Sequence, residues 1–198
     1  MTNTALSTLK TRRTQYALGK KTDLTNDQIA DLIKEAIRLS PSAFNSQSSR
    51  AVILFGAESD KVWETIGETL RPFCGDNFEP TKAKMDSFAA GVGTVLFYED
   101  QDVVKGLQEA YPMYAAAFPG FSEHSTGMAQ ISVWNVLAEA GLGASLQHYS
   151  PVADEALAKA FNIPASWSLK AQMPFGSNEA AFGEKAIVAD EGRFLTFA

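Results

Sequence analysis

Residues 40–50 hold the densest group of side chains that could bind a small molecule. Their sequence is S-P-S-A-F-N-S-Q-S-S-R, placed between a segment of helical periodicity and the apolar run 51–55. Hydroxyls, amides and backbone N–H groups match the hydrogen-bonding edge of a planar heterocycle. A solvated loop that caps a helix explains the same composition, because Ser, Asn and Pro are common in loops. Residues 40–50 alone leave both interpretations open.

A basic cluster near the N-terminus is the second candidate. Lys10, Arg12 and Arg13 lie within four residues, followed by Thr14, in a protein whose net charge is −6. Guanidinium forks and a threonine hydroxyl suit a phosphate group, so the cluster predicts an anion site. A basic surface turn is the ordinary alternative for such a cluster.

Residues 102–121 begin with a helical pattern and then become rich in aromatic rings interrupted by prolines. A mobile aromatic cap over a pocket would have this composition, and so would a packed helical hairpin. The rings are Tyr111, Tyr114, Phe118 and Phe121, and the prolines are Pro112 and Pro119.

Composition narrows the functional classes. A chain of 198 residues that is 45% hydrophobic predicts one domain spanning residues 1–198. The acidic net charge argues against a nucleic-acid partner. No apolar run reaches the length of a membrane span and no signal peptide is visible, so we expect a cytoplasmic protein with no membrane partner. With Cys74 as the single cysteine and two histidines, we expect neither a disulfide within the chain nor a metal site.

The common catalytic motifs are absent. The sequence has no G-x-G-x-x-G after a strand, no Walker A motif and no G-x-S-x-G elbow. It offers no strong nucleophile or base of its own. An enzyme with this sequence would therefore take its chemistry from a bound cofactor.

The helix before the candidate loop is the clearest structural prediction. Residues 25–28 form a Thr-x-x-Gln capping box, and apolar residues then recur at positions 29, 32, 33, 36 and 37. This pattern predicts a helix over 27–39, which Pro41 helps to end.

The remaining elements alternate unevenly, which favours an α+β layer fold with a mixed sheet. A helix at 125–140 is apolar on most faces, which is typical of a helix in the core or in a subunit interface. We expect the chain to turn at Phe175-Gly176, and a short tail over 193–197 suits strand addition to a partner subunit. Other helices are expected at 1–10, 59–71, 81–90 and from Ser150-Pro151 to 161, and strands at 50–55, 94–98, 144–149 and 169–174.

Four motifs occur in the order found in one enzyme family. They are Arg12-Arg13-Thr14, the segment P-S-A-F-N-S-Q at 41–47, Gly141-Leu142-Gly143 and Met173-Pro174-Phe175-Gly176. Over residues 8–190 the chain resembles the nitroreductase family, most closely its short fatty-acid-repression-mutant (FRM2/HBN1-like) subgroup.

This resemblance implies a fold and a reaction. The fold is α+β, with a mixed central sheet flanked by helices, in an obligate homodimer with intertwined ends. The dimer cleft holds one FMN per subunit. NADH or NADPH reduces FMN by hydride transfer to flavin N5, and a small nitroaromatic or quinone then accepts the electrons in a ping-pong cycle. No side chain is assigned as a catalytic acid or base.

The resemblance also implies which residues contact FMN and the electron acceptor. For the phosphate and ribityl chain it gives Arg12, Arg13, Thr14 and the late Lys185, with Gly183 standing where larger relatives carry a second basic residue. For the isoalloxazine ring it gives Ser42, Ala43, Phe44 and Asn45 from the other subunit, Gln47 as a support of their loop, and Gln147, His148 and Tyr149 near the reactive edge. His148 could equally be a core histidine. The candidates for an aromatic slot that takes the acceptor are Phe44, Tyr111, Tyr114 and Phe118.

Two other functions fit the same residues. One is a more specialised flavin dehydrogenase, and the other is a non-catalytic flavin-binding or stress-regulatory protein.

Overall fold

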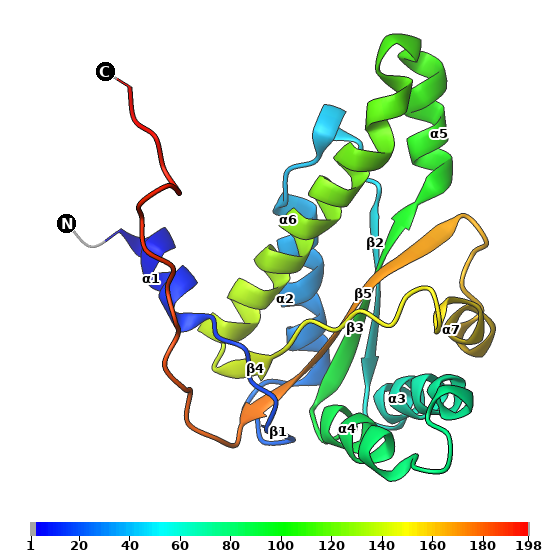
Figure 1. Cartoon of the computed structure of the whole chain (residues 1–198), viewed down its shortest axis with the longest axis vertical. Coiled ribbons are helices and arrows are strands. Elements are labelled where there is room, and N and C mark those ends of the chain that lie inside the picture. The colour runs from blue at the N-terminus through cyan, green and yellow to red at the C-terminus, as the bar shows by residue number, and fades with distance from the viewer. Residues whose placement is uncertain (1–2, 198) are drawn as a thin grey trace.

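A five-stranded sheet forms the centre of the computed structural model, which describes residues 3–197 (Figure 1). The strand order is β1-β5-β3-β2, and β4 also pairs with β5. These strand pairs are antiparallel, and Thr14 forms an isolated parallel bridge with Ala144. The strands are β1 (Leu18–Gly19), β2 (Ser49–Phe55), β3 (Gly93–Asp100), β4 (Leu142–Ala144) and β5 (Trp167–Asn178). The predicted α+β fold class, with helices flanking a sheet, is confirmed.

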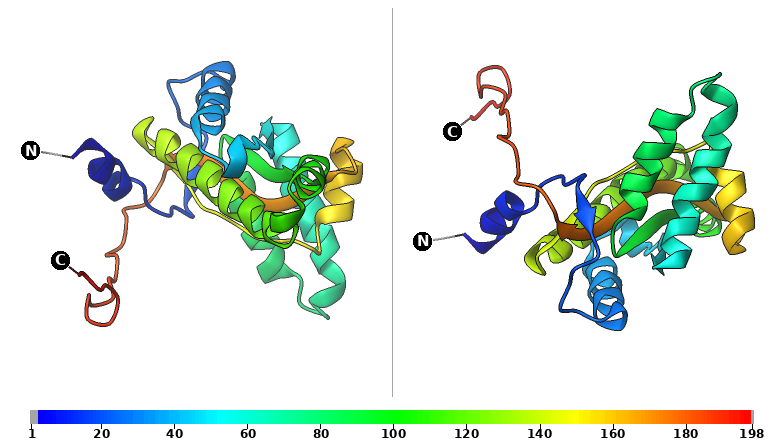
Figure 2. Two further views of the ribbon diagram at one scale, coloured as in Figure 1. Left: turned by 90° about the horizontal axis from the view of Figure 1, so that it is seen from above. Right: turned by 90° about the horizontal axis from the view of Figure 1, so that it is seen from below.

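Helices cover both faces of the sheet (Figures 1 and 2). Neighbouring side chains of β3 enter different cores because strand residues alternate between faces, so Phe97 joins one core and Leu96 the other. The helices α2 (Asn26–Leu39) and α6 (Phe118–Glu139) cover the face of Phe97, and α3 (Ala57–Leu70), α4 (Glu79–Ala89) and α7 (Asp154–Phe161) cover the face of Leu96. Further elements are α1 (Thr4–Thr11), η1 (Ala43–Asn45), η2 (Arg71–Phe73), α5 (Gln101–Ala110) and η3 (Pro112–Ala117).

The helix before the candidate loop forms as predicted. Thr25 Oγ1 accepts a hydrogen bond from Gln28 N at 3.2 Å, and Gln28 Oε1 accepts one from Thr25 N at 2.8 Å, which completes the capping box. The apolar stripe of α2 is buried against the sheet and α6, with Ile29 and Ile33 fully covered. Because α2 is fixed at its cap and along this stripe, it delivers the chain to residues 40–50 in a defined position.

Two predicted helix starts are wrong. The long helix α6 begins at Phe118 rather than at 125, because Pro119 lies in its first turn, where a backbone N–H has no intrahelical acceptor. The helix predicted from Ser150-Pro151 begins at Asp154. The Ser150 hydroxyl donates to the Asp154 carboxylate at 2.7 Å instead of capping backbone amides.

Two strand predictions also need correction. The strand expected at 144–149 is β4, which ends at Ala144, and beyond it only Gln147 makes a bridge, to Gln172. The turn expected at Phe175-Gly176 does not occur, since β5 continues to Asn178. Gly176 is needed inside the strand because a β-carbon there would collide with the carbonyl oxygen of Gly19.

Both ends of the chain lie on the same side of the molecule, away from α3, α4 and α7 (Figures 1 and 2). After β5, residues 179–197 contain no helix or strand and are exposed. Within residues 3–197, no helix combines the length and apolarity needed to cross a membrane. In that same part of the chain, no group of His, Cys, Asp and Glu side chains is arranged to hold a metal ion.

Candidate functional site

The loop between α2 and β2 has a strained backbone. Phe44, Asn45 and Gln47 have φ values of 56°, 49° and 48°. For residues with a β-carbon this left-handed conformation is unfavourable by about 1–2 kcal/mol each, so the surrounding structure must hold it. Such strain is concentrated at ligand sites, which agrees with the binding interpretation of residues 40–50.

Hydrogen bonds at both ends of the loop hold this conformation. Ser42 Oγ accepts from Gln47 N at 3.0 Å, closing the loop on itself. Ser125 Oγ on α6 accepts from Ala43 N at 3.2 Å, which ties the loop to the central helix. Phe44 and Asn45 are exposed. The loop therefore presents an aromatic ring and an amide to solvent on a rigid base.

Four aromatic rings meet beside this loop. The Phe44 ring centroid lies 5.0 Å from that of Tyr111, 6.1 Å from that of Tyr114 and 5.2 Å from that of Phe118. Phe118 is buried at the start of α6, whereas the other three rings are about half exposed. The structure thus brings together the four rings predicted to form an acceptor slot, here called the aromatic cluster.

A hollow of about 180 Å³ lies between α2, the loop and α6. Ser42, Gln47 and Ser125 line it together with Arg38 of α2. A larger open groove of about 520 Å³ runs along the outer edge of β2, past Ala51, Ile53 and Phe55. Concave surfaces with a few polar groups are typical small-molecule sites, and both depressions are of this kind. The hollow is the one lined by Ser42 and Gln47 of the predicted loop.

The predicted anion site lies at the other end of α6. The Arg12 guanidinium carbon lies 4.4 Å from the Trp134 ring centroid, where α1 meets α6. Arg12 Nε, Trp134 Nε1 and Asn135 Oδ1 are buried and have no hydrogen-bond partner within residues 3–197. Buried polar atoms are nearly always hydrogen-bonded. In this group, here called the α1–α6 seam, the two N–H donors of Arg12 and Trp134 fit a bound anion or a partner chain, whereas the Asn135 amide oxygen requires a donor.

The other predicted phosphate contacts are arranged differently. Arg13 Nη2 donates to the carbonyl oxygen of Gly183 at 2.7 Å, so Arg13 binds the C-terminal tail. Thr14 is exposed and forms the parallel bridge to Ala144. Lys185 is exposed on the tail. The structure therefore brings Arg13 and the start of the tail together but does not bring Lys185 to Arg12.

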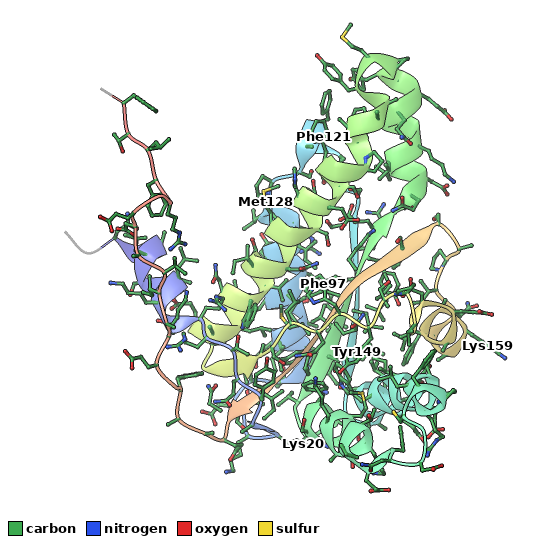
Figure 3. All side chains as sticks on the ribbon, viewed as in Figure 1. Lys20, Phe97, Phe121, Met128, Tyr149 and Lys159 are labelled. Atoms are coloured by element: carbon green, nitrogen blue, oxygen red, sulfur yellow. The ribbon has the colours of Figure 1, made fainter. Side chains whose placement is uncertain are left out.

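The segment after β4 divides between two environments. Gln147 is buried, and its Nε2 donates to Ser145 Oγ at 3.0 Å. His148 is exposed, so its interpretation as a core histidine is wrong. The Tyr149 ring packs against Trp63 with centroids 6.2 Å apart, and burial raises the pKa of its phenol. Tyr149 is thus partly buried and packs against the core near α3, far from Phe121 at the upper end of α6 (Figure 3).

One chain presents the predicted site in two separate parts. The loop is tied to α6 at Ser125, whereas the α1–α6 seam contacts α6 at Trp134. These positions are about two and a half turns apart, or about 14 Å along the helix axis. Within the described chain, the loop predicted to contact the ring and the arginine predicted to bind an anion therefore do not face each other directly.

For several residues at these two parts of the site, the sequence does not indicate a functional role. Trp134 and Asn135 sit in a helix whose apolar residues cover most faces, so nothing marks them as ligands. Ser125 lies in the same helix, and its sequence context does not indicate that it binds the loop. Glu99 and Asp100 are acidic residues that end an apolar strand, a pattern typical of a helix cap; Asp100 does cap α5, whereas Glu99 is fully buried beside the loop.

Similarity to known proteins agrees with these observations. The family model described as the nitroreductase family matches residues 9–177. A structure of the nitroreductase CinD from Lactococcus lactis matches with a TM-score of 0.91 and 47% identity, covering 98% of this chain and 100% of CinD. CinD was solved with nicotinic acid, with chloramphenicol and with 4-nitrophenol.

Two proteins of Saccharomyces cerevisiae are similar along nearly their whole length. HBN1 is 39% identical over 190 residues, which is 95% of each chain. FRM2 is 32% identical over 191 residues, which is 94% of each chain. A more distant nitroreductase from Desulfitobacterium hafniense, solved with bound FMN, shares the fold at a TM-score of 0.70 and 15% identity, over the full length of both chains.

Proposed function

The chain belongs to the nitroreductase family, and we propose that this nitroreductase-type oxidoreductase uses bound FMN to transfer electrons from NADH or NADPH to small nitroaromatic or quinone acceptors. The observation that carries the proposal is the α1–α6 seam, where the buried Arg12 Nε has no partner within residues 3–197. FMN is the cofactor in a structural relative, and its phosphate matches this donor.

Arg12 is proposed to hold the phosphate. A guanidinium presents parallel N–H donors to a phosphate, and stacking on Trp134 restricts it to one orientation. Lys185 adds a second cation if the exposed tail folds toward the phosphate. Arg13 is given a different role from the one the resemblance implied, because its guanidinium binds the Gly183 carbonyl. Thr14 follows on the same segment, is exposed, and is proposed to contact the ribityl chain.

The loop is proposed to hold the isoalloxazine ring. When bound, FMN supplies a carrier that accepts two electrons from a nicotinamide and passes them to an acceptor. Ser42 and Asn45 provide polar groups for the edge of the ring, and Phe44 provides an apolar face. Gln47 supports the loop through the hydrogen bond that its backbone N–H donates to Ser42 Oγ. Gln147 and His148 remain candidates for the opposite edge, whereas the side chain of Tyr149 is directed into the core.

A homodimer would join the two parts of the site. The face of α6 opposite the sheet carries Gly127, Ile131 and Ala138, which are small or apolar and are not covered as the sheet-facing side is. Packing two copies of this face together would place the loop of one subunit near the α1–α6 seam of the other. This supports the contribution of both subunits to each FMN site.

The C-terminal tail is proposed to bind along the partner's sheet. β2 is an edge strand, and its groove is lined by the cations Lys34, Arg38 and Arg50 as well as by apolar residues. The tail combines exposed apolar side chains with acidic ones at 184, 190 and 191, which outnumber the two cations Lys185 and Arg193. An extended apolar segment of complementary charge is the kind of partner that an open sheet edge binds.

The acceptor is proposed to stack against the aromatic cluster. Planar electron-poor rings pack well on aromatic side chains, and CinD binds two nitroaromatic compounds. Nicotinic acid in CinD has the pyridine ring of a nicotinamide, which supports NADH or NADPH as the reductant. Holding both reactants against one surface in turn is consistent with ping-pong transfer.

Steady-state turnover tests this function. We expect the purified protein with FMN to oxidise NADH or NADPH in the presence of 4-nitrobenzoate or menadione, with parallel lines in a double-reciprocal plot. Rapid oxidation of NAD(P)H without reduction of either acceptor would indicate a more specialised flavin dehydrogenase. Bound FMN without turnover above trace rates would indicate a non-catalytic flavin-binding or regulatory protein.

A further inference from the structure

A carboxylate lies completely buried beneath the loop. Glu99, near the end of β3, has no exposed surface. Its Oε2 accepts hydrogen bonds from Ser48 Oγ at 2.6 Å and Ser122 Oγ at 2.7 Å, and its Oε1 accepts one from Ser49 Oγ at 2.5 Å. Within residues 3–197, no ion pair involves Glu99. A buried carboxylate without a cation is costly, so its three hydroxyl donors are essential to its placement.

These three serines belong to the elements that shape the candidate site. Ser48 and Ser49 are the residues directly after the strained loop, and Ser122 lies on the first turns of α6, next to the rings of Phe118 and Phe121. Ser46 Oγ lies 3.3 Å from Ser48 Oγ, which extends the hydrogen-bond network into the loop itself.

The neighbouring carboxylate holds the loop from the other side. Asp100 Oδ2 binds Arg50 Nη2 at 3.1 Å, and Arg50 Nη1 donates to the carbonyl oxygen of Gln47 at 2.7 Å. Asp100 Oδ1 also accepts from Asp102 N, which caps α5. Glu99 therefore binds the middle of the segment 47–50, while Asp100 binds Arg50 at its end and Arg50 in turn binds the Gln47 carbonyl oxygen. Of the two carboxylates, Glu99 is the fully buried one.

We propose that Glu99 is a positioning residue, which through Ser48, Ser49 and Ser122 fixes the loop 42–47 relative to the aromatic cluster. The role of this geometry in placing the flavin ring and acceptor rests on the function proposed above. Charge-assisted hydrogen bonds are about twice as strong as neutral ones, so they suit a loop that must hold three residues at positive φ. Without the hydrogen bonds to Glu99, the loop relaxes while the α1–α6 seam keeps its structure.

Hydrogen exchange of the Glu99→Gln variant tests this role on the protein as purified. The informative amides are those of Ala43, Asn45, Ser46 and Gln47, which are hydrogen-bonded within the loop or to α6. Glutamine keeps the shape but replaces charged acceptors with an amide. We expect exchange of these amides to rise about tenfold, while exchange within α2 and α3 stays unchanged, because a loss of about 1.4 kcal/mol corresponds to a factor of ten.

Glu123→Gln is the matched control. Like Glu99→Gln, it replaces a carboxylate acceptor with an amide. Glu123, however, lies on the exposed surface of α6, where it accepts from Lys170 Nζ at 2.6 Å. Exchange in the loop should stay at the level of the unmodified protein. If Glu99→Gln does not fold, Ser122→Ala removes a single donor and should give a smaller rise confined to the loop. Unchanged loop exchange in the folded variant, or an equal rise throughout the chain, would overturn the proposal.

A kinetic comparison separates this proposal from the proposed function. In the FMN-loaded protein, Glu99→Gln should raise KM for the acceptor several-fold, with a smaller change in kcat and the same amount of FMN bound. If the protein binds no FMN but Glu99→Gln still raises exchange selectively in the loop, the positioning role of Glu99 stands and the proposed function is refuted. If the protein binds FMN and turns over but loop exchange is unchanged in Glu99→Gln, the proposed function stands and the positioning role is refuted.

Discussion

Arg12→Ala is expected to weaken FMN binding about 100-fold. The guanidinium is held by Trp134 at the α1–α6 seam, and its Nε is buried without a partner within the described residues. Removing one member of a buried, charge-assisted contact costs about 2–5 kcal/mol, and every 1.4 kcal/mol is a factor of ten. Titration of the apoprotein with FMN, followed by flavin fluorescence, measures this loss directly.

Two variants control for general effects of removing charge. Arg12→Lys keeps the charge but lacks the fork that matches phosphate, so we expect an intermediate loss of about tenfold. Arg71→Ala removes an exposed arginine that is paired with Glu68 on the α3 side of the sheet, and it should leave FMN affinity unchanged. Full FMN affinity in Arg12→Ala would remove Arg12 from the site.

Ile131→Asp is expected to convert the protein to a monomer and to abolish FMN binding at micromolar concentrations. Ile131 lies on the face of α6 opposite the sheet, at the centre of the proposed subunit interface. A carboxylate buried there without a partner would cost several kcal/mol on both sides of a two-fold axis. Light scattering after size exclusion measures the mass, and FMN titration of the same sample measures the affinity.

Phe73→Asp is the matched control. Phe73 is 74% exposed in η2, beyond α3, so the same change of an apolar residue to aspartate lies away from the proposed interface. This variant should remain dimeric and keep FMN. A dimeric Ile131→Asp variant would contradict the placement of the interface, and a monomer that retains FMN would contradict the two-subunit site.

The sequence predicted the fold well where a periodic pattern was long. The capping box and five apolar positions defined α2 almost to the residue. Short or irregular elements could not be predicted in this way. β1 has only two residues, and β5 continues through Gly176, whose local signal indicates a turn but whose role is close backbone approach.

The candidate site was predictable in composition but not in arrangement. The loop and the three rings at 111, 114 and 118 are each local in the sequence, and Phe44 does pack on those rings. In contrast, the network around Glu99 joins three elements distant in the chain, so no local pattern indicates it. The separation of Arg12 from the loop depends on how α1 and α6 pack, which spacing alone does not define.

The visible absorption spectrum of the purified protein, with the released chromophore identified, shows whether the protein carries FMN. We expect the bands of an oxidised flavin, about one FMN per subunit released on denaturation, and bleaching of the bands by NADH or NADPH. A colourless protein that takes up no added FMN would contradict the proposed roles of Arg12, of the loop and of the dimer together.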